Sequence, residues 1–173
     1  RPLHLLWLNL LTDGLMGLAL GLESAETDVM NRPPRKPTAP ILDGATIAHV
    51  SWMGAFICGA SLLLAGAWHR FGWGNGEWQT VLFSAIGFAQ IGQAWGLRAL
   101  AEKPFRFGRN PALAGLTLVT LVLQLGVIYV PSLALAFKLQ PLSPAGLGAT
   151  AGLGLFTFVL VHLERRRHGR RPI

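Results

Sequence analysis

The sequence predicts an all-α membrane protein, a bundle of five transmembrane helices. Of its 173 residues, 51% are hydrophobic and only 13% are charged, and the mean hydropathy is positive at +0.45, which is not the profile of a small soluble domain. The apolar residues fall into five runs of about 20, the length of helix that crosses a hydrocarbon core of roughly 30 Å. Because Cys58 is the single cysteine, a disulfide framework and a cysteine metal site are both excluded.

Capping residues and prolines mark the ends of the spans. We expect the spans at about residues 3–22, 44–68, 78–97, 111–130 and 144–164, all within one membrane domain that covers residues 1–173. Asp43 is the expected N-cap of the second span. The fourth and fifth spans begin with pairs of a capping residue and a proline, Asn110-Pro111 and Ser143-Pro144. The segment between the fourth and fifth spans is expected to be a loop.

The basic residues of the loops predict the orientation. Twelve of them lie in loops on one side: Arg32, Arg35, Lys36, Arg98, Lys103, Arg106, Arg109, Arg165, Arg166, Arg167, Arg170 and Arg171. Arg1, Arg70 and Lys138 lie on the other side. Because Lys and Arg accumulate on the cytoplasmic side, we expect the N-terminus outside and the C-terminus in the cytoplasm. Such clusters also contact anionic lipid, which we favour over binding to nucleic acid.

Three polar side chains interrupt the first apolar run. Asn9, Thr12 and Asp13 have the spacing i, i+3, i+4, which places them on one face of an α-helical turn. A carboxylate in hydrocarbon costs at least about 2.5 kcal/mol, so Asp13 must face the bundle interior, a water-filled cavity or a cation. Carboxylate, amide and hydroxyl oxygens are ligands for hard cations such as Ca²⁺, which takes about six to eight of them, so other helices must supply the rest. The alternative is that Asp13 pairs with another buried polar group and fixes helix packing.

Small residues and a further polar face predict helix contacts. Glycines follow the polar cluster at positions 14, 17 and 21, and they permit close helix approach or local unwinding beside an ion site. Two pairs have the small-xxx-small spacing of touching helices: Gly54 with Cys58, and Gly148 with Gly152. One face of the fourth span carries Thr117, Thr120 and Gln124, and we interpret this face as helix packing in preference to a permeation path.

The segment LLWLNLLTDGLMGLALGLESAETDVMNRPPRKP resembles the sixth transmembrane helix and following cytoplasmic loop of P-type cation-transporting ATPases of the calcium-pump branch. It carries the family's pattern L-W-x-N-L-x-T-D-G and, downstream, M-x-R-P-P-R. The resemblance implies that Asn9, Thr12 and Asp13 coordinate the transported ion. The four later spans show a weaker similarity to the seventh to tenth helices of the same pumps.

The sequence also departs from that family. Gln90 stands where calcium pumps that carry two ions have a glutamate in the eighth helix, so the resemblance implies a ligand oxygen without a charge, as in pumps with one calcium site. The alternative for Gln90 and Gln93 is an interhelical hydrogen bond. Met16 stands where the sarcoplasmic-type pumps usually have proline, which weakens the expectation of unwinding after Asp13.

Most of the family's ATP-driven machinery lies outside these residues. The phosphorylation motif D-K-T-G-T and the dephosphorylation loop T-G-E-S do not occur in the 173 residues, so we expect this chain alone to be inactive and to bind no cofactor. The first residue, Arg1, suggests a piece cut from a longer polypeptide. The parent pump is expected to use ATP and Mg²⁺ and to transport Ca²⁺ or another hard cation.

The expected partners follow from that interpretation. They are the transported cation, the lipid bilayer, and the N-terminal helices and cytoplasmic ATPase domains of the same polypeptide. We expect a multi-pass protein of the cell (plasma) membrane. The alternative function is that of a free-standing five-span scaffold or accessory subunit without transport activity.

The loop after the first span is expected to couple the ion site to the phosphorylation domain. Pro33 and Pro34 restrict the backbone around Arg32 and Arg35, whose guanidinium groups would pair with carboxylates of that domain. The alternative is that these arginines only determine the topology.

Overall fold

The structure is a computed structural model, and it describes residues 2–23, 44–74, 76–97 and 110–168. Every regular element within these ranges is a helix. Four helical segments are long and apolar enough to cross a membrane: Pro2–Gly21, Thr46–Phe71, Pro111–Tyr129 and Pro144–Arg165. They coincide with four of the five predicted spans, which confirms the prediction of an all-α membrane protein.

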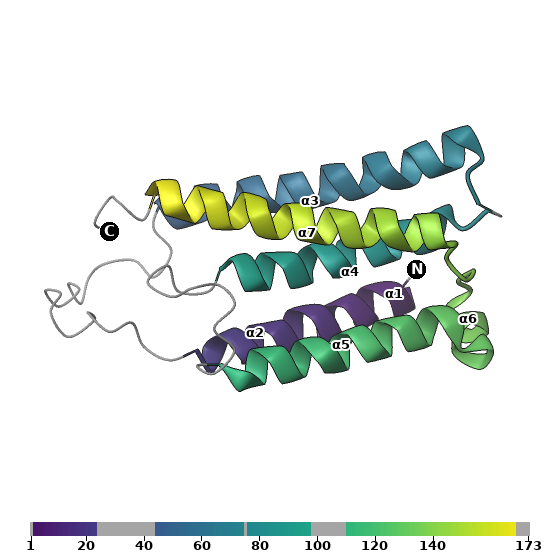
Figure 1. Cartoon of the computed structure of the whole chain (residues 1–173), viewed down its shortest axis with the longest axis horizontal. Coiled ribbons are helices and arrows are strands. Elements are labelled where there is room, and N and C mark those ends of the chain that lie inside the picture. The colour runs from purple at the N-terminus through teal and green to yellow at the C-terminus, as the bar shows by residue number, and fades with distance from the viewer. Residues whose placement is uncertain (1, 24–43, 75, 98–109, 169–173) are drawn as a thin grey trace, which may run out of the picture.

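The helices lie alongside one another (Figure 1). They occur along the chain in the predicted order. The first helix is continuous and consists of α1 (Pro2–Trp7), the π-helical turn η1 (Leu8–Gly14) and α2 (Leu15–Gly21). The remaining elements are α3 (Gly44–Phe71), α4 (Trp78–Gly96), α5 (Pro111–Tyr129), α6 (Pro131–Phe137) and α7 (Pro144–His168).

The segment after the fourth predicted span contains a short helix, α6, where the sequence predicted only a loop. Pro131 occupies its first turn, a position in which the missing N–H of proline costs no hydrogen bond. The helix ends at Lys138, which adopts the left-handed conformation with φ 53° and acts as a C-cap. Proline therefore ends α5 and at the same time begins the next helix.

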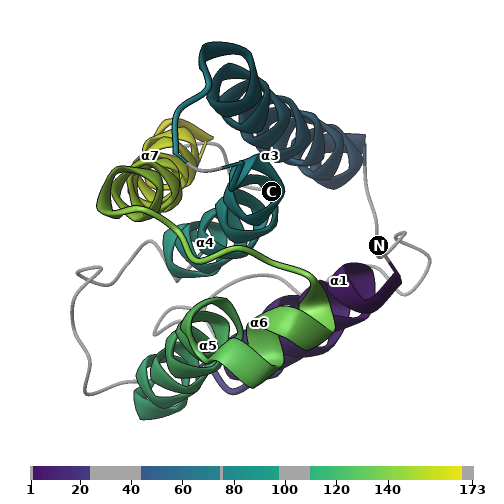
Figure 2. The ribbon, with the colours of Figure 1, turned by 90° about the vertical axis from the view of Figure 1, so that its right-hand side faces the viewer.

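Helix α4 occupies the predicted third span but is not among the four apolar segments. It is 19 residues long, and 11 of these residues are buried. Seen along the helices, α3, α4 and α7 form one group and the first helix, α5 and α6 form another; α4 contacts members of both groups (Figure 2). Its polar residues are accommodated between helices, so its low hydropathy follows from its central position. The count of five membrane spans stays a prediction.

Helices α4 and α7 approach each other backbone to backbone. A Cβ atom built on Gly92 would lie 2.0 Å from the carbonyl oxygen of Gly154, and one built on Gly154 would lie 2.6 Å from the carbonyl oxygen of Phe88. The described residues do not show the helix contacts predicted from spacing for Gly54, Gly148 and Gly152, because a Cβ atom built on any of these glycines would meet no atom of another described segment within 4 Å. The contact instead uses Gly92 on α4 and Gly154 on α7.

The predicted caps at α5 and α7 are confirmed. The Asn110 side chain accepts a hydrogen bond from the backbone N–H of Leu113 at 2.8 Å, and its Nδ2 donates to the carbonyl oxygen of Ala19 at 2.9 Å. Asn110 therefore both caps α5 and ties it to α2. Ser143 Oγ accepts a hydrogen bond from the backbone N–H of Gly146 at 3.1 Å. Asp43, Arg32, Arg35 and most of the basic loop residues lie outside the described residues, so the predicted cap of α3, the coupling loop and the orientation stay predictions.

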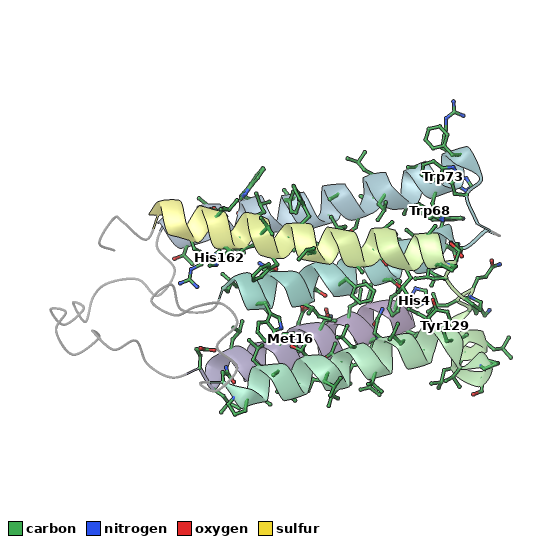
Figure 3. The ribbon with its side chains drawn as sticks, in the orientation of Figure 1. His4, Met16, Trp68, Trp73, Tyr129 and His162 are labelled. Atoms are coloured by element: carbon green, nitrogen blue, oxygen red, sulfur yellow. The ribbon has the colours of Figure 1, made fainter. Side chains whose placement is uncertain are left out.

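A buried carboxylate joins three helices at the end of the bundle where Trp68, Trp73 and Tyr129 lie (Figure 3). Glu77 is 3% exposed and accepts hydrogen bonds from Trp68 Nε1 at 3.0 Å and from the backbone N–H of Ser143 at 2.7 Å. The carboxylate thus links the end of α3, the start of α4 and the first turn of α7, a contact that the sequence did not reveal.

Candidate cation site

The polar cluster of the first helix lies on a π-helical turn. Hydrogen bonds in a π-helix join residues five apart, so one turn holds more residues than an α-helical turn does. Side chains four residues apart then point in nearly the same direction. Asn9 and Asp13 accordingly share the open side, where both are exposed. Thr12 points inward and is 1% exposed. The three side chains predicted to share one face therefore lie on two sides of the helix: Asn9 and Asp13 on the open side and Thr12 on the buried side.

Gly14 closes this turn. A Cβ atom built on Gly14 would lie 3.4 Å from the carbonyl oxygen of Asn9, five residues earlier in the chain. The glycines at 14, 17 and 21 are interpreted from the sequence as permitting close helix approach or local unwinding, and the structure shows a π-helical turn that ends at Gly14. The helix is α-helical again from Leu15 onward, through Met16.

Gln90 brings α4 to the polar cluster. Its Oε1 accepts a hydrogen bond from Thr12 Oγ1 at 2.5 Å, and its Nε2 donates to Asp13 Oδ1 at 2.6 Å. The Thr12 hydroxyl also lies within hydrogen-bonding reach of the carbonyl oxygen of Leu8, and its single proton serves one of these acceptors at a time. The interhelical hydrogen bond that the sequence held as an alternative for Gln90 is therefore present.

A cleft between the first helix and α4 opens at this cluster. Its volume is about 220 Å³, and polar groups from Thr12, Asp13, Gln90 and Gln93 contribute to its lining. The rest of the lining is apolar and comes from Met16, Gly17, Leu20, Ala94 and Leu97. Asp13 therefore faces an open cleft flanked by amide groups, the kind of surrounding that a carboxylate in a membrane helix requires.

The structure brings three of the four predicted ligands together and leaves one apart. Thr12, Asp13 and Gln90 form the hydrogen-bonded group, whereas Asn9 lies on the same open side as Asp13 but outside the lining of the cleft. Oxygen atoms of these types suit a hard cation. Within the described part of the chain, no three His, Cys, Asp or Glu side chains come together, and Asp13 is the one acidic residue among those that line the cleft.

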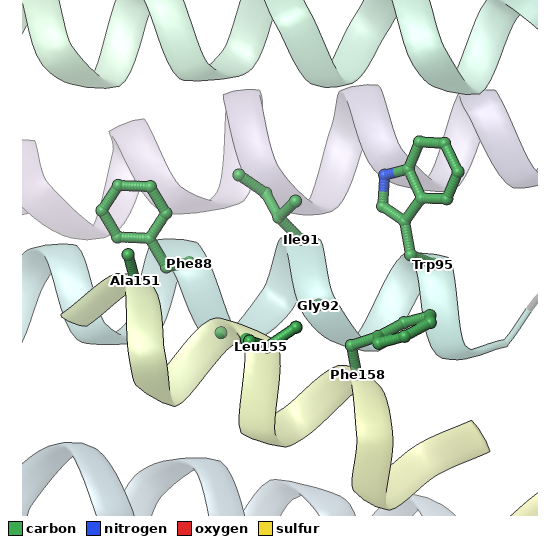
Figure 4. Close-up of a pocket in the computed structure, with 8 residues that line it drawn as sticks. Phe88, Ile91, Gly92, Trp95, Ala151, Leu155 and Phe158 are labelled. Carbon is green, nitrogen blue, oxygen red and sulfur yellow. The ribbon is translucent and has the colours of Figure 1, made fainter. Parts of the chain in front are cut away.

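A second cleft of about 270 Å³ lies between α4 and α7 (Figure 4). It is lined by the aromatic rings of Phe88, Trp95 and Phe158 together with aliphatic residues and glycines. It offers no carboxylate, amide or hydroxyl oxygen from a side chain. Of these two clefts, the one beside Asp13 is therefore the one whose side chains offer oxygen ligands for a cation.

The polar face of α5 packs against the first helix, as predicted. Thr117, Thr120 and Gln124 are all buried. Thr117 Oγ1 accepts a hydrogen bond from Trp95 Nε1 at 3.0 Å and donates to the sulfur of Met16 at 3.8 Å, so it joins α4 and α2. Sequence reasoning treated this face as packing, and the interpretation is confirmed.

The fold and the site together define a multi-pass helical membrane domain with a polar cluster, Thr12, Asp13 and Gln90, at a cleft between the first helix and α4. Residues 1–167 match the family described as "Cation transporting ATPase, C-terminus", and the chain belongs to this family.

Curated relatives agree with that assignment. The chain is 32% identical over 169 residues to a calcium-transporting ATPase of Bacillus subtilis, an alignment that covers 92% of the chain and 18% of the relative. It is 31% identical over 168 residues to the calcium-transporting ATPase type 2C member 2 of Mus musculus, with coverage of 94% and 18%. The corresponding protein of Rattus norvegicus is 30% identical over 168 residues, with the same coverage. The chain therefore spans about a fifth of the length of these relatives.

Proposed function

We propose that this chain supplies part of the intramembrane cation site of an ATP-driven pump. In this proposal Asp13 provides the negative charge, and Asn9, Thr12 and Gln90 provide neutral oxygens. The observation that carries the proposal is an exposed carboxylate on a π-helical turn, hydrogen-bonded to Gln90 and facing a polar cleft within a predicted membrane span. π-Helical turns in α-helices are frequent at functional sites.

The exposed side chains of Asn9 and Asp13 are the part of the site that other helices would complete. Four ligands leave part of a Ca²⁺ coordination shell unfilled, since that ion takes about six to eight oxygens. The relatives described above are calcium-transporting ATPases, which supports Ca²⁺ as the transported ion. The presence of an amide at Gln90, with one carboxylate beside it, supports a single ion for this site.

The proposed transport cycle assigns ATP and Mg²⁺ to domains of the same polypeptide outside this chain. The ion enters from the cytoplasmic side, binds at Asp13, and leaves on the outer side when the site is distorted or protonated. The other described helices brace the site. In this proposal the pump lies in the plasma membrane, surrounded by lipid on the apolar outer faces of α3, α5 and α7.

The substitution Asp13→Asn in the full-length pump tests this function. The amide keeps the size and a carbonyl oxygen of the side chain but removes the charge, so Ca²⁺-activated phosphorylation from ATP should be abolished while expression and membrane insertion stay near normal. Phosphoenzyme formation at graded Ca²⁺ concentrations is the measurement. Thr120→Val is the control for loss of a polar side chain elsewhere in the bundle, because the Thr120 hydroxyl donates its hydrogen bond within its own helix, to the carbonyl oxygen of Leu116.

Normal Ca²⁺ dependence in the Asp13→Asn variant would refute the proposed role. The alternative, a five-span scaffold or accessory subunit, would then become the better interpretation. The reading frame upstream of Arg1 separates the two functions independently. A phosphorylation motif D-K-T-G-T in that frame supports the pump, whereas a start codon directly before Arg1 supports the alternative.

A further inference from the structure

Gln124 is a buried polar residue whose hydrogen bonding is only half satisfied. It lies on α5 and is 1% exposed. Its Oε1 accepts a hydrogen bond from Trp7 Nε1 at 3.1 Å, whereas its Nε2 is buried with no hydrogen-bond partner among the described residues. The amide packs against α4, because a Cβ atom built on Gly87 would lie 3.5 Å from Nε2.

Such an arrangement is unfavourable for the stability of the bundle taken alone. A buried N–H without a partner loses the free energy of its hydration, and an apolar side chain of similar size at this position would avoid that loss. The unpaired Nε2 of Gln124 therefore calls for an explanation beyond helix packing. The hydrogen bond of the Gln124 amide goes to Trp7. Any influence of Gln124 on the first helix must therefore pass through Trp7.

Trp7 immediately precedes the π-helical turn. Its indole is held on two sides, by the hydrogen bond to Gln124 and by an edge-to-face contact with Phe137, whose ring centroid lies 5.0 Å away. Helix α5 holds the chain on the other side of the turn as well, where Thr117 contacts Met16 and Asn110 contacts the backbone of Ala19. The contacts from α5 thus bracket the turn that carries Asn9 and Asp13.

A π-helical turn is less favourable than the α-helical hydrogen-bonding pattern it replaces, so contacts at its ends must maintain it. If Trp7 were free to rotate with the helix, the turn would relax toward α-helical geometry. Thr12 would then move toward the face shared by Asn9 and Asp13, and away from Gln90.

We propose that Gln124 is a positioning residue for the cation site, which it holds in its π-helical register through Trp7. The proposal rests on the proposed function of Asp13 for its effect on ion binding, but its structural part does not. Gln124 does not touch the ion in this proposal. It fixes the direction in which the ligands point.

The test uses the full-length pump and three variants: Gln124→Met, Trp7→Phe and the double variant. Methionine keeps the length of the side chain without the acceptor, and phenylalanine keeps a ring against Phe137 without the indole N–H. Two readouts are compared, hydrogen exchange of the backbone amides of residues 8–14 and the Ca²⁺ concentration that half-saturates phosphorylation. Thr120→Val is the control for loss of a buried polar group on the same face of α5.

We expect both single variants to speed exchange in residues 8–14 and to raise the half-saturating Ca²⁺ concentration about three- to fifteenfold, the equivalent of one interhelical hydrogen bond in a membrane. The maximal phosphoenzyme level should stay near that of the unmodified pump. The double variant should be no worse than the single ones, because both remove the same bond. The control should change neither readout.

Unchanged exchange in residues 8–14 of the Gln124→Met variant would overturn the proposal, whatever happens to Ca²⁺ dependence. Faster exchange with an unchanged half-saturating concentration would also overturn it, since Gln124 would then be only structural. These outcomes are distinguishable from a failure of the proposed function, which shows as normal Ca²⁺ dependence in Asp13→Asn. In that case the exchange readout still decides whether Gln124 fixes the turn.

Discussion

Gln90 uses both ends of its amide in the structure. The oxygen accepts from Thr12 and the nitrogen donates to Asp13, so no oxygen of Gln90 is directed at the carboxylate that would bind the ion. Rotation about the terminal bond of the side chain exchanges the two groups, because the amide is nearly symmetric in shape but not in hydrogen bonding. We infer that Gln90 holds Asp13 before the ion binds and presents its oxygen afterwards.

The substitution Gln90→Met tests that inference at the residue scale. Methionine has a similar volume but lacks both hydrogen bonds and the ligand oxygen. The half-saturating Ca²⁺ concentration of the full-length pump should therefore rise about ten- to a hundredfold, which corresponds to the free energy of a hydrogen bond that involves a charged group. Activation should not be abolished, because the charge of Asp13 remains. Phosphoenzyme formation against Ca²⁺ concentration is the measurement.

Gln93→Met is the matched control for that experiment, since Gln93 lines the same cleft but does not bridge Thr12 and Asp13. It should shift the curve much less. A tighter binding of Ca²⁺ by Gln90→Met would contradict the inference, because it would mean that the amide only competes with the ion for the carboxylate.

At the scale of elements, the sequence predicted which segments are helices but not which sides of them touch. Asn110 and Ser143 predicted the starts of α5 and α7 correctly, because a cap depends on residues three positions away. The spacing of Gly148 and Gly152 predicted a helix contact that the described residues do not show. Helix α7 carries several glycines, and only tertiary packing decides that Gly154 faces α4.

The contact between α4 and α7 gives a prediction of its own. A methyl group on Gly92 would lie far inside contact distance of the backbone of Gly154, and backbone cannot move aside as a side chain can. We expect Gly92→Ala to separate the two helices and to lower the free energy of unfolding by about 1–3 kcal/mol or more, since about 1–3 kcal/mol is the usual cost of overpacking. The thermal unfolding midpoint in detergent should fall clearly.

Gly152→Ala is the control for that experiment, because an added Cβ atom at Gly152 meets no atom of another described segment within 4 Å. Its midpoint should stay the same or rise slightly, since alanine is the better helix former. Equal loss of stability in both variants would show that the effect comes from glycine in the helix and not from the contact between the helices.

For the whole molecule, the sequence identified the polar residues of the first helix but did not predict how their side chains are arranged. Asn9, Thr12 and Asp13 stand out because polar groups are rare in an apolar run, and this signal needs no knowledge of packing. The division of their side chains between an open and a buried side could not be predicted, because it depends on a π-helical turn whose flanking contacts come from α5, more than 90 residues away along the chain.

Helix α4 illustrates the same limit for the fold. The extent of the apolar run predicted its bounds closely, as residues 78–97 against Trp78–Gly96. Its central place in the bundle was not predicted, since a sequence gives the polarity of a helix but not its neighbours. Three of the residues that lower its apolar character meet other helices: Gln90 meets the first helix, Gly87 lies against Gln124 of α5, and Gly92 lies against Gly154 of α7.

The last prediction concerns the chain as a whole, taken by itself. Asn9 and Asp13 are exposed, and the polar cluster offers four candidate ligands, of which only Asp13 is acidic, whereas Ca²⁺ takes about six to eight oxygens. Water must fill the rest of the shell, so the isolated chain in detergent should bind Ca²⁺ no more tightly than about millimolar, the weak end of protein calcium sites. Calorimetry on the helical chain, with its Asp13→Asn variant as the blank, measures this. A micromolar or tighter dissociation constant that Asp13→Asn removes would mean that these residues form a complete site without the rest of the pump.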